Sequence, residues 1–391
     1  MNQITLPSIL DNDFYKFTMQ HAVVQLFPYA KARYQFINRG KHEYPENFAQ
    51  KLRKAIDLMA NLHLTNAERD FLEINCTYLP PTYLDFLKGY RYDPSEVKIS
   101  QNDGTLVVTI EGYWYRTILW EVPIMSLICE LFYIETKQER QDNQWVIENI
   151  KNKAEAYTKL NVNFAEFGTR RRHSYNVHEL VVKTLCENAT HNFMGTSNVH
   201  LAMKYQTKPI GTHAHEWFMF HGARYGYKMA NSVGLEHWVK VYRGDLGIAL
   251  TDTYTTEVFF EQFDKKFAKL FDGVRHDSGD PITFGERTIA HYKNLGINPL
   301  TKTIIFSDGL NYDKVEKITN HFKGKVGISF GIGTDFTNDV GLKPMNIVLK
   351  MTQALPHNGK WTGVVKLSDE PKKHTGLEND IFLSKKLLQI D

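Results

Sequence analysis

The stretch that decides the fold is Gly-Val-Arg-His-Asp-Ser-Gly-Asp-Pro, residues 273–281. A short strand pattern ends there in a polar, glycine-containing loop, and a helical pattern over 286–295 follows. The same order of strand, loop and helix returns with a strand at 303–306 and a helix over 312–322. It is preceded by a strand at 247–250 and an amphipathic helix over 257–271. Repeated strand-then-helix units predict parallel strands joined by right-handed crossovers.

Polar residues and glycines follow each of these strands, and a fourth strand, 325–330, runs into Gly-Ile-Gly-Thr at 331–334. The carboxyl ends of parallel strands share one rim, so this pattern favours a barrel over an open sheet. A complete eightfold barrel needs roughly 250 residues. We therefore expect a shortened, irregular (β/α) barrel over residues 151–344.

Residues 1–150 have a mixed pattern that predicts a separate α/β domain. Asp13 is a candidate N-cap for a helix, residues 32–37 alternate like a strand, and 97–110 predict a hairpin. The tail, 345–391, contains a strand pattern at 361–367 and is expected to pack back on the N-terminal domain.

Composition limits the classes of function. The net charge is +3, so nonspecific nucleic-acid binding is not expected. Three widely spaced cysteines give neither a disulfide framework nor a zinc site, which favours the cytoplasm. The first seven residues lack a signal-peptide pattern. The most apolar run, 122–133, is too short to cross a membrane and predicts a buried core helix.

Gly331 to Thr334 are a candidate phosphate loop, because glycines let backbone N–H groups approach a phosphate and threonine adds a hydroxyl donor. The alternative is a tight turn without a ligand. The dinucleotide fingerprint fails, since Phe336 occupies the place of its third glycine, and no P-loop triplet is present.

Arg275, Asp277 and Asp280 place one cation beside two carboxylates at a strand end. The arginine suits phosphate or carboxylate, and the two aspartates are candidate Mg²⁺ ligands. The alternative is a local salt-bridge network, which Asp252 and Asp308 at neighbouring strand ends make less favourable, since converging acids repel one another. The three arginines at 170–172 could bind an anionic substrate, but taken alone this run favours a solvated basic turn.

His213 and His215 lie in a loop before an aromatic-rich helical pattern. No zinc-protease spacing is present, since His215 and His221 are six residues apart. An imidazole on a barrel rim is a competent nucleophile near neutral pH. Glu216, Asp252 and Asp277 are all candidates for the acidic partner that orients it.

These loops resemble the motifs of the nicotinate phosphoribosyltransferase family, the ATP-coupled enzymes of NAD salvage. The resemblance runs nearly end to end. It is carried by seven segments in the same order, at residues 13–16, 166–171, 195–198, 211–216, 275–281, 306–308 and 330–334.

The resemblance implies an irregular (β/α) barrel of the type II phosphoribosyltransferase kind joined to an α/β sandwich-like N-terminal domain. The implied reaction joins nicotinate to 5-phosphoribosyl-1-diphosphate (PRPP), giving nicotinate mononucleotide and pyrophosphate while ATP is hydrolysed. ATP and Mg²⁺ are the expected cofactors. Nicotinamide phosphoribosyltransferase, and a non-catalytic barrel that binds PRPP or nucleotide, are the alternatives.

By the same resemblance, His215 is the histidine that becomes phosphorylated, and Asp277 is a second catalytic residue. Tyr15 is expected to stack on the pyridine ring from the neighbouring subunit, which implies a homodimer with a shared active site. The substrate-binding candidates are Tyr15, Thr212 and Arg275 at nicotinate, Arg170 in the same pocket, Gly333 and Thr334 at the PRPP phosphate, Asp308 at the ribose, and Phe167 and Asp252.

Overall fold

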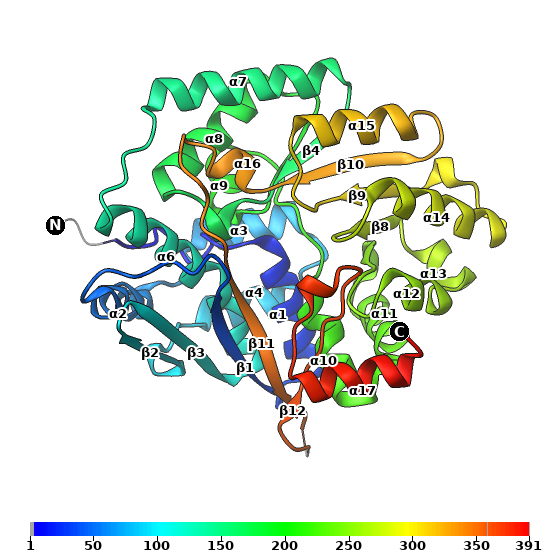
Figure 1. Ribbon diagram of the computed structural model, residues 1–391, viewed down its shortest axis with the longest axis horizontal. Coiled ribbons are helices and arrows are strands. Elements are labelled where there is room, and N and C mark those ends of the chain that lie inside the picture. Colours follow the sequence, from blue (N-terminus) through cyan, green and yellow to red (C-terminus); the bar gives the residue numbers. More distant parts are fainter. Residues whose placement is uncertain (1–3, 358, 391) are drawn as a thin grey trace.

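A six-stranded parallel sheet forms the centre of the larger part of the molecule (Figure 1). A computed structural model describes residues 4–357 and 359–390. Residues 1–3, part of the segment predicted to lack a signal peptide, lie outside the described residues. The strand order is β5-β4-β10-β9-β8-β7. The bounds are β4 (Asn163–Glu166), β5 (Phe193–Thr196), β7 (Ile248–Leu250), β8 (Gly273–His276), β9 (Thr303–Phe306) and β10 (Gly327–Ile332).

The gap between β5 and β7 is bridged by an irregular segment, which makes the sheet an incomplete barrel. Pro209 forms a parallel bridge with Thr196 of β5. On the other side, Thr212 Oγ1 donates to the Ile248 carbonyl (3.3 Å), and the Leu250 N–H donates to Nε2 of His213 (3.2 Å). The predicted irregular barrel is confirmed.

Helices cover the outside of the barrel. Their bounds are α7 (Asn143–Lys159), α8 (Tyr175–Asn188), α9 (Val199–Lys204), α10 (His215–Tyr225), α11 (Ala230–Tyr242), α14 (Pro281–Asn294), α15 (Tyr312–Phe322) and the short α16 (Thr334–Thr337). The single helix expected over 257–271 is wrong. The chain breaks into α12 (Thr256–Gln262) and α13 (Lys265–Leu270), because the Asp264 side chain accepts from Phe267 N–H and caps a new helix.

The N-terminal part is built on an antiparallel sheet with the order β12-β11-β1-β3-β2. Three strands come from the first part of the chain, β1 (Lys31–Asn38), β2 (Val97–Asn102) and β3 (Thr105–Tyr113). The other two come from the tail, β11 (Ile347–Leu355) and β12 (Thr362–Gly363). The long strand β11 pairs with β1 along eight residue pairs, so the two ends of the chain share one sheet.

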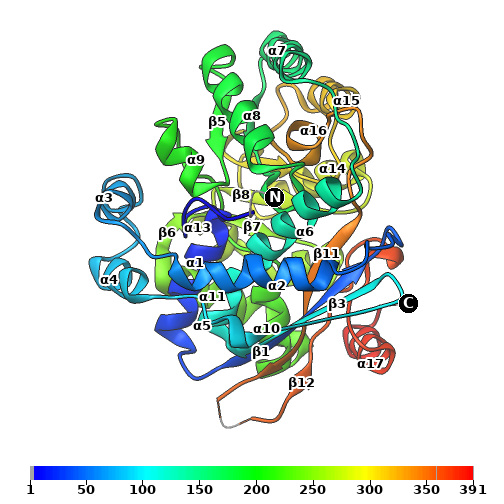
Figure 2. The same ribbon diagram turned by 90° about the vertical axis from the view of Figure 1, so that its left-hand side faces the viewer.

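Helices surround this sheet. Figure 2 shows α3 and α4 on the opposite side of the molecule from α17. The bounds are α1 (Phe14–Leu26), α2 (Phe48–Leu58), α3 (Asn66–Asn75), α4 (Pro81–Gly89), α5 (Trp114–Thr117), α6 (Glu121–Glu135) and α17 (Glu378–Leu388).

One helical run, Trp114–Glu135, is long and apolar enough to cross a membrane by length and composition. It is longer than the 122–133 segment predicted, because α5, a 3-10 turn and α6 follow one another without a break. Within the protein 89% of its most apolar window is buried. Burial against the other elements, rather than insufficient length, identifies it as a core helix.

The tail also contacts the barrel. The strand predicted over 361–367 is shorter than expected, because only Thr362 and Gly363 pair with β11. Further on, the Leu367 N–H donates to the Thr253 carbonyl (2.8 Å), and Asp369 accepts from the N–H and hydroxyl of Thr256. The segment 366–369 therefore lies against the loop that follows β7.

The arginine run at 170–172 is not a solvated basic turn, because Arg172 is fully buried. Its guanidinium makes two hydrogen bonds to the buried carboxylate of Asp11, at 2.6 and 2.7 Å. Burial alone would raise the pKa of Asp11, but the charge and hydrogen bonds of Arg172 hold it below its usual value. This pair joins the N-terminal segment to the loop after β4.

We predict that Gly273→Ala destabilises the barrel. A Cβ at Gly273 would lie 1.8 Å from the backbone carbonyl oxygen of Thr303 on the neighbouring strand, so β8 and β9 would have to separate. We expect the free energy of unfolding to fall by about 3 kcal/mol, measured by urea denaturation followed by circular dichroism.

The matched control is Gly89→Ala, where an added Cβ meets no atom within 4 Å at the end of α4. Its expected effect is a change of no more than about 1 kcal/mol. Equal stability of the two variants would contradict the packing argument.

Candidate active site

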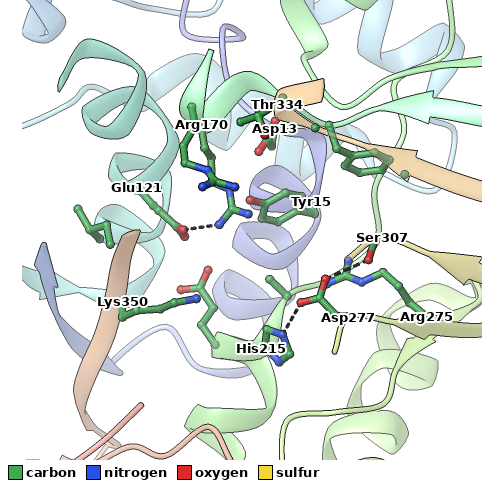
Figure 3. A pocket seen from close by; sticks show the side chains of 18 of the residues that line it. Asp13, Tyr15, Glu121, Arg170, His215, Arg275, Asp277, Ser307, Thr334 and Lys350 are labelled. Carbon is green, nitrogen blue, oxygen red and sulfur yellow. Dashed lines mark hydrogen bonds and ion pairs between the residues drawn. The ribbon is translucent and has the colours of Figure 1, made fainter. Parts of the chain in front are cut away.

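A pocket of about 220 Å³ lies where the barrel rim meets the N-terminal sheet (Figure 3). Its walls come from α1, the loops after β4, β8, β9 and β10, the start of α10, and β11. Eight predicted site residues line it: Tyr15, Phe167, Arg170, His215, Arg275, Asp277, Gly333 and Thr334.

Three predicted substrate-binding residues do not line the pocket. The Thr212 hydroxyl is turned towards β7, where it bonds the Ile248 carbonyl. Asp252 is buried behind His215, and Asp308 forms an ion pair with Lys373 at 2.8 Å. Their predicted contacts with substrate stay predictions.

His215 is the first residue of α10 and has partners on both ring nitrogens. Nδ1 lies 3.0 Å from the Thr253 hydroxyl, and Nε2 lies 2.9 Å from Asp277 Oδ2. Lys366 Nζ is also 2.8 Å from Nε2. Nε2 therefore faces one acceptor and one donor, so it either donates to Asp277 or accepts from Lys366. Among the three acids that the sequence left open, Asp277 makes the closest contact.

The imidazole of His215 is neutral at physiological pH. Burial and the nearby charge of Lys366 lower its pKa to about 4, against the opposing effect of Asp252 and Asp277. A neutral ring keeps one nitrogen lone pair, which is what a nucleophile needs. The side chain retains 10% exposure and lines the pocket, so the ring borders the cavity.

Asp277 is held in its ionised form at the pocket wall. Burial would raise its pKa, but the hydrogen bond with His215 and the charges of Arg275 and Lys366 hold the pKa well below its usual value. Its second oxygen accepts from the Ser307 hydroxyl (3.0 Å). Arg275 donates to the His213 carbonyl (3.3 Å), while its buried Nε has no hydrogen-bond partner among the described residues. That unpaired donor favours an anionic ligand.

The loop after β4 lies beside the loop after β10, because these two strands are neighbours in the sheet. The buried carboxylate of Glu166 fixes the first loop, because it accepts from the N–H of Gly168 and from the Thr196 hydroxyl, and contacts His178 Nε2. The second loop carries Gly333 and Thr334 into the pocket. The predicted phosphate loop thus lies next to Phe167, whose carbonyl oxygen would be 3.4 Å from a Cβ at Gly333.

A buried charge network adjoins the pocket, and the sequence did not reveal it. Lys16 of α1 has no exposed side-chain surface and forms ion pairs with Glu121 of α6 and Glu216 of α10. Glu121 also accepts from Arg170 (3.1 Å), and Glu216 accepts from the Tyr34 hydroxyl (2.6 Å). Arg170, with 42% of its side chain exposed, is thereby oriented from behind.

The signal for Glu121 was a carboxylate at the start of a mostly apolar run. Lys350 is a similar case, a lysine between Leu349 and Met351 in an apolar strand. Both line the pocket. Neither residue belongs to a local motif, because the chain brings each to the pocket from a segment far from the barrel loops.

Tyr15 lines the pocket of its own chain, and its predicted stacking on the pyridine ring of a neighbouring subunit stays a prediction. The reason for its place in the pocket is the position of α1, whose first residues pack against the segment 209–213. A Cβ at Gly211 would lie 2.8 Å from the backbone nitrogen of Tyr15. The homodimer itself stays a prediction.

The predicted Mg²⁺ pair, Asp277 and Asp280, does not share one environment. Asp280 is exposed and caps α14 by accepting from Thr283 N–H (2.8 Å). A different group, His215, Asp252 and Asp277, has ligand atoms within 4.8 Å of one another. The ammonium of Lys366 already lies among them, 3.5 Å from Asp252, and supplies a positive charge there. Asp277 is the carboxylate of the predicted pair that lines the pocket.

The fold and the pocket define a class. An α/β barrel whose rim gathers a neutral histidine, several cations and a glycine loop is an enzyme scaffold suited to phosphorylated, anionic substrates.

The comparisons with known proteins are specific. The sequence model of the nicotinate phosphoribosyltransferase (NAPRTase) family matches residues 162–389, and that of the NAPRTase N-terminal domain matches residues 10–129. A nicotinate phosphoribosyltransferase from Chromohalobacter salexigens is 59% identical over 98% of this chain and 99% of its own length. One from Desulforapulum autotrophicum is 48% identical over 98% of this chain and 99% of its own length.

Solved structures agree. The crystal structure of nicotinate phosphoribosyltransferase from Porphyromonas gingivalis has a TM-score of 0.96 at 46% identity, covering 98% of this chain and 100% of that one. The crystal structure of nicotinate phosphoribosyltransferase from Vibrio cholerae has a TM-score of 0.91 at 35% identity, covering 98% of this chain and 94% of that one. The chain belongs to the nicotinate phosphoribosyltransferase family.

We predict that Lys16→Met destabilises the protein and disorders the pocket. The variant leaves Glu121 and Glu216 buried without their cation, and removing one partner of a buried pair typically costs about 3–5 kcal/mol. The measurement is the free energy of unfolding in urea. As a control, Lys51→Met removes a partly exposed pair with Glu135 and should change stability by about 1 kcal/mol or less.

Proposed function

We propose that this chain transfers the phosphoribosyl group of PRPP to nicotinate, that ATP hydrolysis accompanies the transfer, and that His215 carries the phosphoryl group. The observation that carries the proposal is the convergence of His215, Asp277, Arg170, Arg275 and the glycine loop on one pocket. Membership of the family supports a phosphoribosyltransferase of NAD salvage.

The pocket has matching groups for each part of the substrates. The carboxylate of nicotinate would pair with Arg170 or Arg275, and its ring would lie beside Tyr15 or Phe167. The 5-phosphate of PRPP would be held by Gly333 and Thr334. Because all these groups line one cavity, the pyridine nitrogen and the ribose would be held close together there.

The transfer step breaks the bond between the anomeric carbon and pyrophosphate and forms one to the pyridine nitrogen. Positive charge builds up on the ribose, and the ionised Asp277 would stabilise it electrostatically. No protein base is needed, because the nitrogen lone pair attacks without losing a proton. Positioning of the two reactants supplies up to roughly 7–11 kcal/mol.

Mg²⁺, when bound, would neutralise the leaving pyrophosphate, with Asp277 as its protein carboxylate and water or phosphate oxygens as the remaining ligands. The residues fit this role only in part, since one Asp277 oxygen contacts His215 and the other accepts from Ser307.

ATP would act through His215. Attack of the neutral ring on the γ-phosphate would form phosphohistidine and release ADP, adding up to about two negative charges beside Lys366 and Asp277. Lys366 offers a compensating cation. Each 1.4 kcal/mol of new interaction with substrate would tighten binding about tenfold. Hydrolysis of phosphohistidine then resets the site.

We predict that His215→Ala abolishes stimulation by ATP and leaves a slow, ATP-independent transfer, because the nucleophile is lost while the substrate contacts remain. Rates of nicotinate mononucleotide formation with and without ATP measure this. The exposed His63 provides the control His63→Ala, which should keep full stimulation. Undiminished stimulation in the His215 variant would remove this residue from the mechanism.

We predict that the wild-type chain prefers nicotinate to nicotinamide by about 100-fold in kcat/KM. The reason is that Arg170 and Arg275 would bind the carboxylate of nicotinate more strongly than the neutral amide of nicotinamide. Competition of the two substrates in one assay measures the ratio. Equal use of both would support the nicotinamide alternative, and binding of PRPP without release of pyrophosphate would support a non-catalytic barrel.

A further inference from the structure

Lys350 is a pocket lysine that neither the substrate contacts nor the phosphorylation step uses. It belongs to β11, and Figure 3 shows its side chain extending from that strand into the cavity. Within residues 4–357 and 359–390, its Nζ has no hydrogen bond and no ion-pair partner within 4 Å. A lysine amine inside a pocket without a fixed partner is available for chemistry.

The other two lysines near the pocket differ from it. Lys16 is fixed between two carboxylates, which raise its pKa against the effect of burial and keep it protonated. Lys366 contacts His215 at 2.8 Å and Asp252 at 3.5 Å. Lys350 alone among the three faces the cavity without a bound partner.

The surroundings of Lys350 favour its neutral form. Burial is the largest cause, and the positive charges of Lys366, Arg170 and Arg39 act in the same direction. Glu121 opposes them, but its carboxylate is already shared by Lys16 and Arg170. Together they lower the pKa of Lys350 to about 7, so the neutral amine is far more accessible at neutral pH than that of a surface lysine.

We propose that Lys350 is a nucleophilic modification site that forms an imine with aldehydes bearing a phosphate group. The amine lone pair attacks the carbonyl carbon, a proton passes from nitrogen to oxygen through solvent, and the carbinolamine loses one water to give the C=N bond. No oxidant or reductant takes part, and water reverses the step.

The preference for a phosphorylated aldehyde follows from the cavity. Arg170, Arg275 and the glycine loop at residues 331–334 line the same cavity as Lys350. The two guanidinium groups would attract an anion. Tyr15 and Phe167 offer ring faces for an aromatic aldehyde. Imine formation needs only the pocket, so it does not depend on catalysis of phosphoribosyl transfer.

The test uses pyridoxal 5′-phosphate, a pyridine aldehyde with a phosphate, on the whole protein at pH 7.5. Borohydride reduction fixes the imine, and peptide mass spectrometry locates it. We expect labelling of Lys350 about tenfold above any other lysine. Inorganic pyrophosphate should protect it, and unphosphorylated pyridoxal should label it less. Its labelling should be half-maximal near pH 7, whereas surface lysines continue to gain label towards pH ~10.4.

Two variants sharpen the result. Lys350→Arg keeps the cation and should lose the pocket label, while Lys98→Arg, at an exposed position on β2, should retain it. Label spread evenly over surface lysines, or an unmodified Lys350 in the folded wild-type protein, would overturn the proposal. Because the wild-type peptide map decides it, a variant that fails to fold leaves the test intact.

Discussion

A single buried ammonium, that of Lys16, joins three segments that are far apart in the chain. It lies between Glu121 at the start of the core helix α6 and Glu216 in the first turn of α10. Two carboxylates this close are stable in the interior only with a cation between them. Since Glu216 follows His215 directly, and Glu121 also holds Arg170, the same ion pairs set the position of both sides of the pocket.

The pocket is completed by the two ends of the sequence rather than by the barrel alone. Tyr15 enters from α1, and Lys350 enters from the tail, which pairs with β1 and then lies against the loop after β7, where Lys366 contacts His215. The barrel supplies His215, Asp277 and the glycine loop from its strand ends. Arg170, Arg275 and Lys350 bring cationic groups from the barrel and the tail into a lining that also contains carboxylates, and these cations suit phosphate or carboxylate groups of a substrate.

Local patterns predicted the barrel well because each strand, loop and helix is encoded by neighbouring residues. The strand Thr303–Phe306 and the helix Tyr312–Phe322 begin and end where the pattern predicted. Predictions failed where distant residues intervened. Arg172 was assigned to a solvated turn because its partner, Asp11, lies 161 positions away. The sheet strand β11 was not predicted, since its pairing with β1 spans most of the chain.

The sequence by itself determined the repeated strand-and-helix units, the identity of the rim residues and, through its seven motifs, the family. Those features depend on local periodicity and on the order of residues along the chain. Only the tertiary structure decided which acid faces His215, that Thr212, Asp252 and Asp308 lie outside the pocket wall, and that Lys350 lies within it. Burial and charge compensation act through space, so no stretch of sequence contains them.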